Sequence, residues 1–310
     1  MLNPRSVKRK YLQTVSYKEP LTDISDSDID QHAFHSSTSK FNYVEEEALK
    51  IEVLPTDKDS FYSIILQQDV LKYKSDFFTD ENVPQYIKDL YLDNIHTDDI
   101  KIFNPKKHND LSETLSSFLI KLRLVLENNA RMYDVTREER FIDDMAIELM
   151  KIVKYDDGKF FTMRPCSLKL VIDDKSFAAE ADREGRRGLR IIWILQENKH
   201  IDDTRYSEGD VQLVSCMIAA YQNNFRTTKE LCPKTMIGIK IKGEEVYFYS
   251  MKMTEQYLTS LSKGIPTEHL KINKYPPKKG LRISDPNNRK EILKFLWIMR
   301  ENALNIPDED

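Results

Sequence analysis

Cysteine and glycine are both scarce in this chain of 310 residues. Its 8 glycines form no glycine-rich turn of the kind that holds nucleotide phosphates, so an ATP-driven enzyme is not expected. The three cysteines, Cys166, Cys216 and Cys232, are widely spaced and odd in number, which indicates neither a disulfide framework nor a zinc site. We therefore expect a reducing compartment, either the cytoplasm or the nucleus.

Long apolar runs are also missing. The chain has no run of about 18 apolar residues, and no apolar stretch follows the basic residues Lys8, Arg9 and Lys10, as a secretory signal would require. We therefore expect neither a membrane partner nor secretion. The net charge of −4 does not by itself favour nucleic acid as a partner, so the distribution of charge along the chain matters more.

Hydrophobic residues are plentiful after a polar start. They make up 40% of the chain and include 15 tyrosines and 14 phenylalanines, enough for one large packed domain or two modest ones. Residues 1–45 are polar and aperiodic, which predicts a flexible arm. Residues 46–134 predict a helical region with helices at FYSIILQQDVLKY, at VPQYIKDLYLDNI after Pro84, and at LSSFLIKLRLVLENN, where Asp110 and Glu113 can form a capping box.

The pattern changes in residues 135–305. A helix from Thr136 is followed by the alternating segment SLKLVIDDKSFAAEADRE, which predicts a hairpin, and by IIWIL, which is typical of a strand covered on both faces. The helix GDVQLVSCMIAAYQNNF, a second hairpin turning at Gly243 and the closing helix NRKEILKFLWIMRENAL complete the order. The sequence therefore predicts an α/β fold with a central mixed β-sheet flanked by helices and an N-terminal helical region.

Charged side chains gather around the IIWIL strand. We expect Asp182 at the end of the preceding hairpin's second strand, while Glu197 and Lys199 lie two apart on the next strand and so share a face. If these strands pair in antiparallel fashion, Asp182 and Glu197 meet at one strand end. Two carboxylates suit Mg²⁺, and the ammonium of Lys199 suits the attacking water or the charged phosphate. The pattern predicts metal-assisted phosphodiester hydrolysis, with a simple ion pair at a strand end as the alternative.

The stretch AEADREGRRGLRIIWILQENK followed by GDVQLVSCMIAAYQNN resembles the PD-(D/E)xK, or restriction-endonuclease-like, nuclease superfamily. It is more closely similar to nuclease-like proteins of fungal genomes, with crinkler-type effector domains as distant relatives. The resemblance covers roughly residues 135 to 300. It implies a nuclease that uses Mg²⁺ or Mn²⁺ held by Asp182 and Glu197, with Lys199 assisting the nucleophile and Gln212 on the following helix orienting water or phosphate. Ala181 stands where the name of the family has proline.

A helix acid often completes a metal site of this kind. Glu139 and Glu138 are both candidates for that position, and Glu148 is a weaker third. Glu139 also has a structural explanation, because it can form a capping box with Thr136. Glu180, two residues before Asp182, is a candidate accessory ligand.

Basic residues concentrate toward the end of the chain. Between residues 226 and 290 bases outnumber acids, which predicts a surface that follows the backbone of DNA or RNA, although a solvated lysine-rich face explains the same pattern. Our second hypothesis is a catalytically inactive nuclease-fold module that binds nucleic acid or a protein partner, since one fold hosts many functions. A homodimer or a partner bound through the N-terminal region is compatible with both hypotheses. The residues expected to contact nucleic acid are Lys271, Lys274, Lys278, Lys279 and Arg282.

Overall fold

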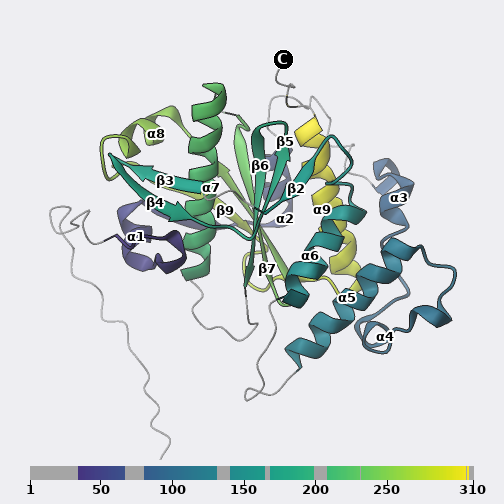
Figure 1. Cartoon of the computed structure of the whole chain (residues 1–310). Coiled ribbons are helices and arrows are strands. Elements are labelled where there is room, and N and C mark those ends of the chain that lie inside the picture. The colour runs from purple at the N-terminus through teal and green to yellow at the C-terminus, as the bar shows by residue number, and fades with distance from the viewer. Residues whose placement is uncertain are drawn as a thin grey trace, which may run out of the picture. The chain divides into compact units, whose positions relative to one another are not determined.

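The computed structural model describes residues 34–66, 80–130, 140–164, 168–198, 208–230, 232–304 and 306. Every described residue belongs to one compact unit, Phe34–Asp310. In this unit helices flank a mixed β-sheet (Figure 1), which confirms the predicted α/β class. None of its described helices has the length and apolar character needed to cross a membrane.

The main sheet has eight strands among the described residues, in an order that differs from their order along the chain. From one edge to the other the strands run β1-β9-β8-β7-β6-β5-β2, and β10 pairs with the start of β8. The strands are β1 (Ile51–Pro55), β2 (Phe161–Met163), β5 (Arg183–Arg187), β6 (Arg190–Asn198), β7 (Thr235–Lys242), β8 (Glu245–Lys252), β9 (Leu270–Tyr275) and β10 (Leu281–Arg282).

Six of the eight described strands of this sheet point the same way: β1, β9, β7 and β6, together with β2 and β10. β6 pairs in parallel with β7, β1 pairs in parallel with β9, and β8 runs antiparallel to both β7 and β9. The carboxyl ends of β1, β9, β7 and β6 therefore meet at one edge of the sheet, which we call the carboxyl edge. Because β5 runs antiparallel to β6, it begins at this same edge.

Helix α7 (Glu208–Thr228) packs along one face of the sheet. It approaches β7 closely: a Cβ on Gly238 would lie 2.6 Å from the Met217 sulfur, so a larger residue here would have to displace the Met217 side chain. Gln222 fastens a hairpin to α7, because its amide accepts from the Val171 N–H and donates to the Val171 carbonyl oxygen, both at 2.8 Å. The same side of the sheet carries α1 (Tyr43–Ala48), the hairpin strands β3 (Leu168–Ile172) and β4 (Lys175–Ala179), and α8 (Glu255–Leu261) (Figure 1).

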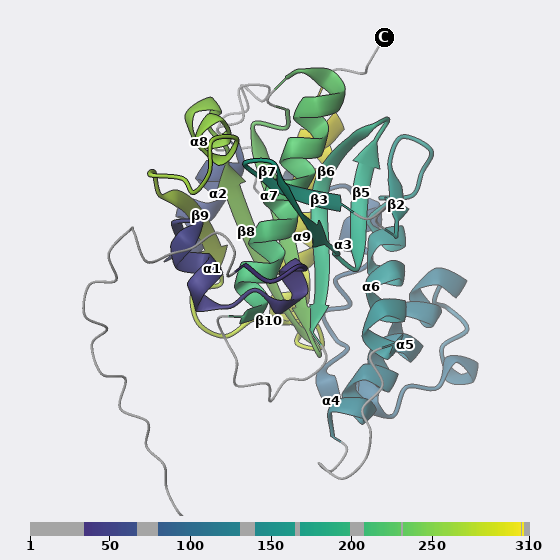
Figure 2. The same cartoon turned by 60° about the vertical axis from the view of Figure 1, so that its left-hand side comes forward.

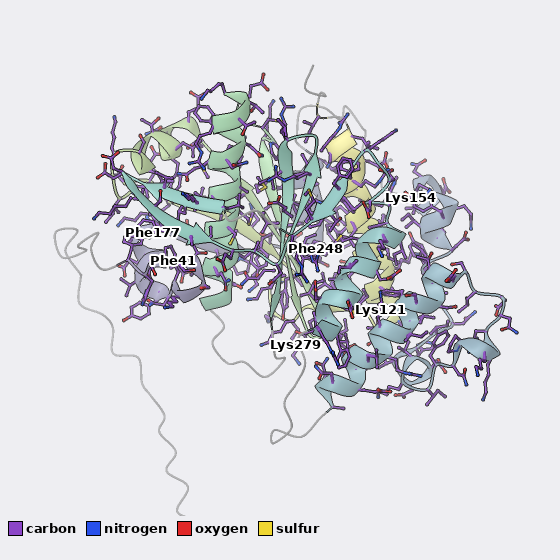
Figure 3. All side chains as sticks on the ribbon, in the orientation of Figure 1. Phe41, Lys121, Lys154, Phe177, Phe248 and Lys279 are labelled. Atoms are coloured by element: carbon purple, nitrogen blue, oxygen red, sulfur yellow. The ribbon has the colours of Figure 1, made fainter. Side chains whose placement is uncertain are left out.

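The opposite face is covered by a second layer of helices and holds the larger hydrophobic core (Figure 2). In this core the rings of Tyr62 and Phe295 stack with centroids 4.1 Å apart, and Phe248 of β8 stacks on Phe295 at 5.0 Å (Figure 3). Trp193 of β6 meets Tyr155 edge to face at 5.4 Å. The helices on this side are α2 (Lys58–Leu66), α3 (Gln85–Lys88), α4 (Thr97–Lys101), α5 (Glu113–Asn129), α6 (Arg140–Ile152) and α9 (Pro286–Leu304).

The region predicted to be helical, residues 46–134, also supplies strand β1 at the edge of the main sheet. Its helices differ in detail from the predicted ones. α3, which follows Pro84, is only four residues long. The predicted cap at Asp110 is wrong, because α5 begins at Glu113 and Ser112 directly before it accepts a hydrogen bond from the Leu115 N–H at 3.3 Å.

Part of the segment predicted to be a flexible arm is packed. Phe34 and Phe41 contact Phe177 of β4, with ring centroids 5.5 and 6.1 Å apart, and Phe41 is buried (Figure 3). Ser37 adds an isolated bridge to Ala178 of the same strand. The two phenylalanines stand among polar residues in the sequence, so their contact with a segment far along the chain was not predicted. Residues 1–33 lie outside the described part.

The predicted acidic hairpin is present, but it ends before Asp182. β3 and β4 pair antiparallel as a separate two-stranded sheet, with Asp173 in the turn at a φ of 53°. β4 ends at Ala179, and Asp182 directly precedes β5. The prediction that Asp182 closes this hairpin is therefore wrong: the chain leaves the small sheet after Ala179 and enters the main sheet at Arg183.

Candidate functional site

Asp182 lies beside the carboxyl end of β6. Its backbone N–H donates to the carbonyl oxygen of Leu195 at 3.1 Å, and the next residue, Arg183, is the register partner of Leu195. Glu197 follows Leu195 by two residues at the end of the same strand. The antiparallel pairing on which the predicted meeting of Asp182 and Glu197 depends is thus present in the backbone. The side chain of Glu197 and the whole of Lys199 lie outside the described part.

Helix α7 brings Gln212 to the same place. The Gln212 Nε2 donates to the carbonyl oxygen of Glu180 at 3.5 Å, two residues before Asp182. One turn further along α7, burial raises the pKa of the Cys216 thiol to about 12, with smaller contributions in the same direction from the carboxylates of Asp182 and Glu180. The two carboxylates therefore act on the turn of α7 that follows the one carrying Gln212. Asp182, Glu180 and Gln212 are gathered at the carboxyl edge.

The start of α6 also reaches this edge. The guanidinium of Arg183 donates to Oδ1 of Asp143 through Nε at 2.9 Å and Nη2 at 2.5 Å. Asp143 lies in the first turn of α6, four residues after Glu139. Glu138 and Glu139 themselves lie outside the described part, so both stay predictions for the helix acid.

Glu148, the weaker helix candidate, is occupied by another contact. Its Oε2 lies 2.5 Å from the Lys121 Nζ, and the carboxylate is buried between α6 and α5 (Figure 3). An ion pair on the α5 side of the helix explains this acid, because a buried carboxylate requires a partner. The structure therefore places Glu148 in the packing between two helices.

The acids at the carboxyl edge fit a hard divalent cation. Asp182 and Glu180 are both exposed, and carboxylate oxygens are the ligands that Mg²⁺ and Mn²⁺ prefer. Within the described ranges, no group of three or more His, Cys, Asp or Glu side chains is arranged so that it could hold a metal ion. The side chain of Glu197 and residues 138 and 139 lie outside these ranges.

The predicted nucleic-acid-binding residues separate into two groups. Lys278 and Lys279 are exposed in the loop that follows β9, at the carboxyl edge (Figure 3). Lys274, near the end of β9, is mostly buried, and its ammonium lies 2.7 Å from the carboxylate of Asp210. Lys271 is exposed but lies toward the start of β9, in register with Glu52 of β1. Of the lysines predicted to form one basic surface, Lys274, Lys278 and Lys279 lie at the carboxyl edge, whereas Lys271 does not.

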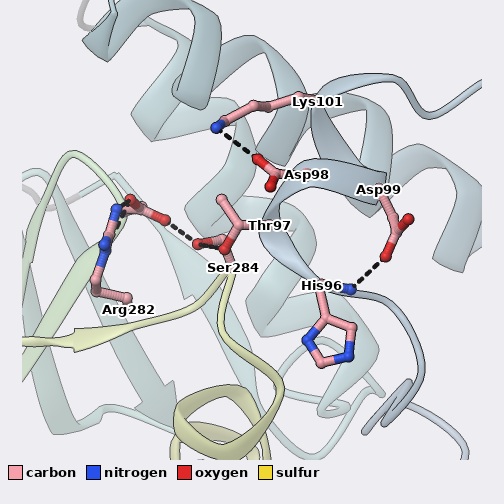
Figure 4. Close-up of polar contacts among 8 residues, drawn as sticks. His96, Thr97, Asp98, Asp99, Lys101, Arg282 and Ser284 are labelled. Atoms are coloured by element: carbon pink, nitrogen blue, oxygen red, sulfur yellow. Dashed lines mark hydrogen bonds and ion pairs between the residues drawn. The ribbon is translucent and has the colours of Figure 1, made fainter.

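Arg282 is bound within the protein. Its Nε donates to Oε1 of Glu244 at 3.0 Å, and its Nη2 contacts the same oxygen (Figure 4). Glu244 also accepts from the Ser284 hydroxyl, which lies 3.0 Å from the Thr97 hydroxyl of α4. The hydrogen bonds that the Arg282 guanidinium donates to Glu244 raise the pKa of Arg282. This arginine joins the turn between β7 and β8 to the helical layer, which leaves it less available for a phosphate than the lysines before it.

The sequence analysis did not identify a buried polar cluster around Asp210, two residues before Gln212 on α7. Asp210 of α7 accepts from Lys240 Nζ at 2.7 Å and from the Tyr249 hydroxyl at 2.8 Å on Oδ1, and from Lys274 Nζ at 2.7 Å on Oδ2. The available signal was IGIKIKG in β7, where Lys240 and Lys242 interrupt a strand that is buried along its whole length. A lysine in such a strand is expected to need a carboxylate across the layer.

Comparisons with known proteins leave the family open. No protein-family model matches the chain, and no protein of curated function matches it.

Proposed function

We propose that the chain is a metal-dependent nuclease of the PD-(D/E)xK class that hydrolyses phosphodiester bonds of nucleic acid. The observation that supports this most is the pairing of β5 with β6, in which the backbone of Asp182 bonds to Leu195 two residues before Glu197. The contact of Gln212 with the carbonyl oxygen of Glu180 adds the helix that follows the Glu-x-Lys strand. Asp182 and Gln212 thus lie at the edge of the sheet where β6, the strand that carries Glu197, ends.

The chemistry follows from the residue types. Mg²⁺ or Mn²⁺ would supply a Lewis acid that activates water and neutralises charge on the phosphoryl group. Asp182 and Glu197 are the proposed ligands, with Glu139 or Glu138 completing the set. Lys199 steadies the attacking water or the phosphate by a compact positive charge.

The substrate reaches this edge beside exposed cations. Lys278 and Lys279 lie in the loop at the carboxyl edge, so they are suited to contact the nucleic acid backbone on the β9 side of the site. Such contacts bind DNA and RNA alike, because they read phosphate and not base identity. A nuclease of this kind is proposed to act in the cytoplasm or the nucleus.

The first test is calorimetric titration of Mn²⁺ into the parent protein and the Asp182→Ala variant, beside cleavage assays on plasmid DNA and RNA. We expect binding in the parent and loss of both binding and cleavage in Asp182→Ala. Asp174→Ala is the matched control, because Asp174 is an exposed acid in the turn of the β3–β4 hairpin. Equal cleavage by parent and Asp182→Ala would refute the assignment, and absence of Mn²⁺ binding in both would leave an inactive module with this fold.

A further inference from the structure

The face of the sheet under α7 changes character at the carboxyl edge. Side chains alternate between the two faces along a strand. On the α7 side of β6, the apolar Ile194 is followed by Gln196. On the α7 side of β7, the apolar Met236 is followed, after Gly238, by Lys240. Gln196 and Lys240 are register partners across the two parallel strands. Lys274 continues the α7 side of β9 beyond Ile272. Polar groups thus replace the core along this edge, although Gln196 and Lys240 are still buried.

The charges gathered here do not balance. Two ammonium groups, those of Lys240 and Lys274, share the single carboxylate of Asp210, each at 2.7 Å. The three side chains are mostly removed from solvent, with exposed fractions of 7%, 17% and 10% in that order. A positive charge held away from water is costly unless an anion compensates it. Among the described residues, the lysine pair and Asp210 leave one such charge.

The N-terminal end of helix α7 adds a partial positive charge to the same place. Asp210 is the third residue of α7, a helix of 21 residues, so the cluster lies at the positive end of the helix. Acids usually occupy that end and cations the other, whereas here the ammonium groups of Lys240 and Lys274 lie against Asp210 in the first turn. Backbone N–H groups, a helix end and ammonium groups are the features of an anion site.

Two further details indicate a ligand. Gln196 is 4% exposed, and its Oε1 has no hydrogen-bond partner in the described structure. Its amide lies next to Lys240 in register, and an amide whose two ends are exchanged presents N–H groups to an oxyanion instead. Lys274, the more exposed of the two lysines, lies over the rings of Tyr247 and Tyr249 at 5.3 and 5.4 Å, which fixes its ammonium at the rim.

We propose that Lys240 and Lys274, held in place by Asp210, form an oxyanion site that binds a backbone phosphate of the nucleic acid beside the Asp182 site. The identity of the anion as a nucleic acid phosphate rests on the proposed nuclease function; the anion site itself rests on the lysine pair. β6 and β7 are neighbouring strands about 5 Å apart, and Lys240 is the register partner of Gln196, which directly follows Leu195, the residue to which the backbone of Asp182 bonds. A phosphate held there positions the strand to be cleaved without contacting the metal ligands.

The anion site is tested with inorganic phosphate alone. We expect potassium phosphate to raise the melting temperature of the parent above its value in potassium chloride of equal ionic strength and pH. Lys274→Gln and Lys240→Met should lose this shift, whereas Lys274→Arg, which keeps the charge, should retain it. Lys271→Gln is the matched control, an exposed lysine on the same strand. Absence of the shift in the parent, or its persistence in Lys274→Gln, would overturn the proposal.

The phosphate of nucleic acid is tested by the salt dependence of oligonucleotide binding, measured with Asp182→Ala so that no cleavage intervenes. Adding Lys274→Gln should reduce the magnitude of the slope of the logarithm of the binding constant against the logarithm of the salt concentration by about 0.7–0.9, because one phosphate contact is lost. The reduction should be similar for oligonucleotides of different sequence. An unchanged slope would overturn the assignment to nucleic acid. The two proposals fail separately: cleavage by Asp182→Ala refutes the nuclease, while the phosphate shift reports on the lysine pair whatever Asp182 does.

Discussion

Arg183 binds Asp143 with two nitrogens on one carboxylate oxygen, Nε at 2.9 Å and Nη2 at 2.5 Å from Oδ1. The pair joins the first residue of β5 to the first turn of α6. Since Asp182 directly precedes Arg183, this contact fixes the distance between the acid at the start of β5 and the helix that follows Glu139. Paired geometry of this type is strong because the guanidinium is planar and always charged.

Asp143→Ala is expected to loosen that junction. The Arg183 side chain is 11% exposed, so removing its partner leaves a mostly buried guanidinium unpaired and lowers the free energy of unfolding by about 1–3 kcal/mol. Urea denaturation followed by circular dichroism measures the loss. Asp144→Ala on the same helix is the control, because Asp144 is exposed, and it should change stability by less than about 0.5 kcal/mol. Equal stability of Asp143→Ala and Asp144→Ala would contradict the role given to the pair.

Asp210→Asn is expected to destabilise the protein in a pH-dependent way. Burial raises the pKa of Asp210, but Lys240 and Lys274 outweigh it and hold the pKa below its ordinary value. A carboxylate with a lowered pKa contributes stability above the pKa of the unfolded chain, about 3.9, and that stability is lost as the pH falls through the folded value. Parent and variant should therefore differ by about 3 kcal/mol at pH 7 and by progressively less below about pH 4.

The measurement for Asp210 is urea unfolding at several pH values between neutral and strongly acidic. Asp174→Asn serves as the control, since Asp174 is an exposed turn residue and its replacement should leave the pH profile of the parent unchanged. A difference between parent and Asp210→Asn that stays constant at all pH values would mean that the Asp210 carboxylate does not depend on the two lysines.

Gln222→Ala is expected to free the β3–β4 hairpin from α7. The Gln222 amide makes two hydrogen bonds of 2.8 Å to the backbone of Val171, so its removal leaves both groups of that residue without their partner. We expect a loss of about 1–2 kcal/mol in unfolding free energy and faster hydrogen exchange confined to the hairpin. Asn223→Ala, at the neighbouring position of the same helix, is the control. Unchanged exchange at Val171 in Gln222→Ala would rule out the fastening role.

Arg289→Lys is expected to be nearly as damaging as Arg289→Met. The guanidinium is fully buried and donates to five backbone carbonyl oxygens, and burial lowers its pKa to about 10. An ammonium has three donors and no planar fork, so it cannot replace these contacts, and either variant should lose about 2–4 kcal/mol of unfolding free energy. Denaturant titration measures this, with Arg226→Lys as the exposed control. Full stability of Arg289→Lys would show that charge alone suffices. The five acceptors are Tyr91, Leu92, Ile95, Ile283 and Ser284.

The fold was predictable where the signal was local. Alternation and turn residues identified both hairpins, and the apolar run IIWIL identified β6. The contact of Phe34 and Phe41 with Phe177 was not predictable, because their neighbours in sequence are polar and the partner is far along the chain. Strand β1 was missed for the same reason: its five residues pair only with β9.

The candidate site divides in the same way. The sequence identified Asp182 and Gln212, which the structure brings to one edge of the sheet, because an acid, an apolar strand and a helix follow one another closely along the chain. It assigned Lys274 to an open basic surface, whereas this lysine binds Asp210. That contact joins β9 to α7 across the face of the sheet, and a linear charge count cannot reveal a pairing between elements so far apart.

Strand β1 has a consequence for any shortened form of this protein. It covers one side of β9, and α2 and α5 cover the larger core, so all of residues 34–304 that are described here share one sheet and its two layers. A fragment that starts near residue 135 would keep the candidate acids but would leave the backbone of β9 open as an edge strand above exposed core residues. Unpaired edges of this kind promote association between molecules. The proposed catalytic region thus depends for its solubility on the part of the chain that contributes no candidate catalytic residue.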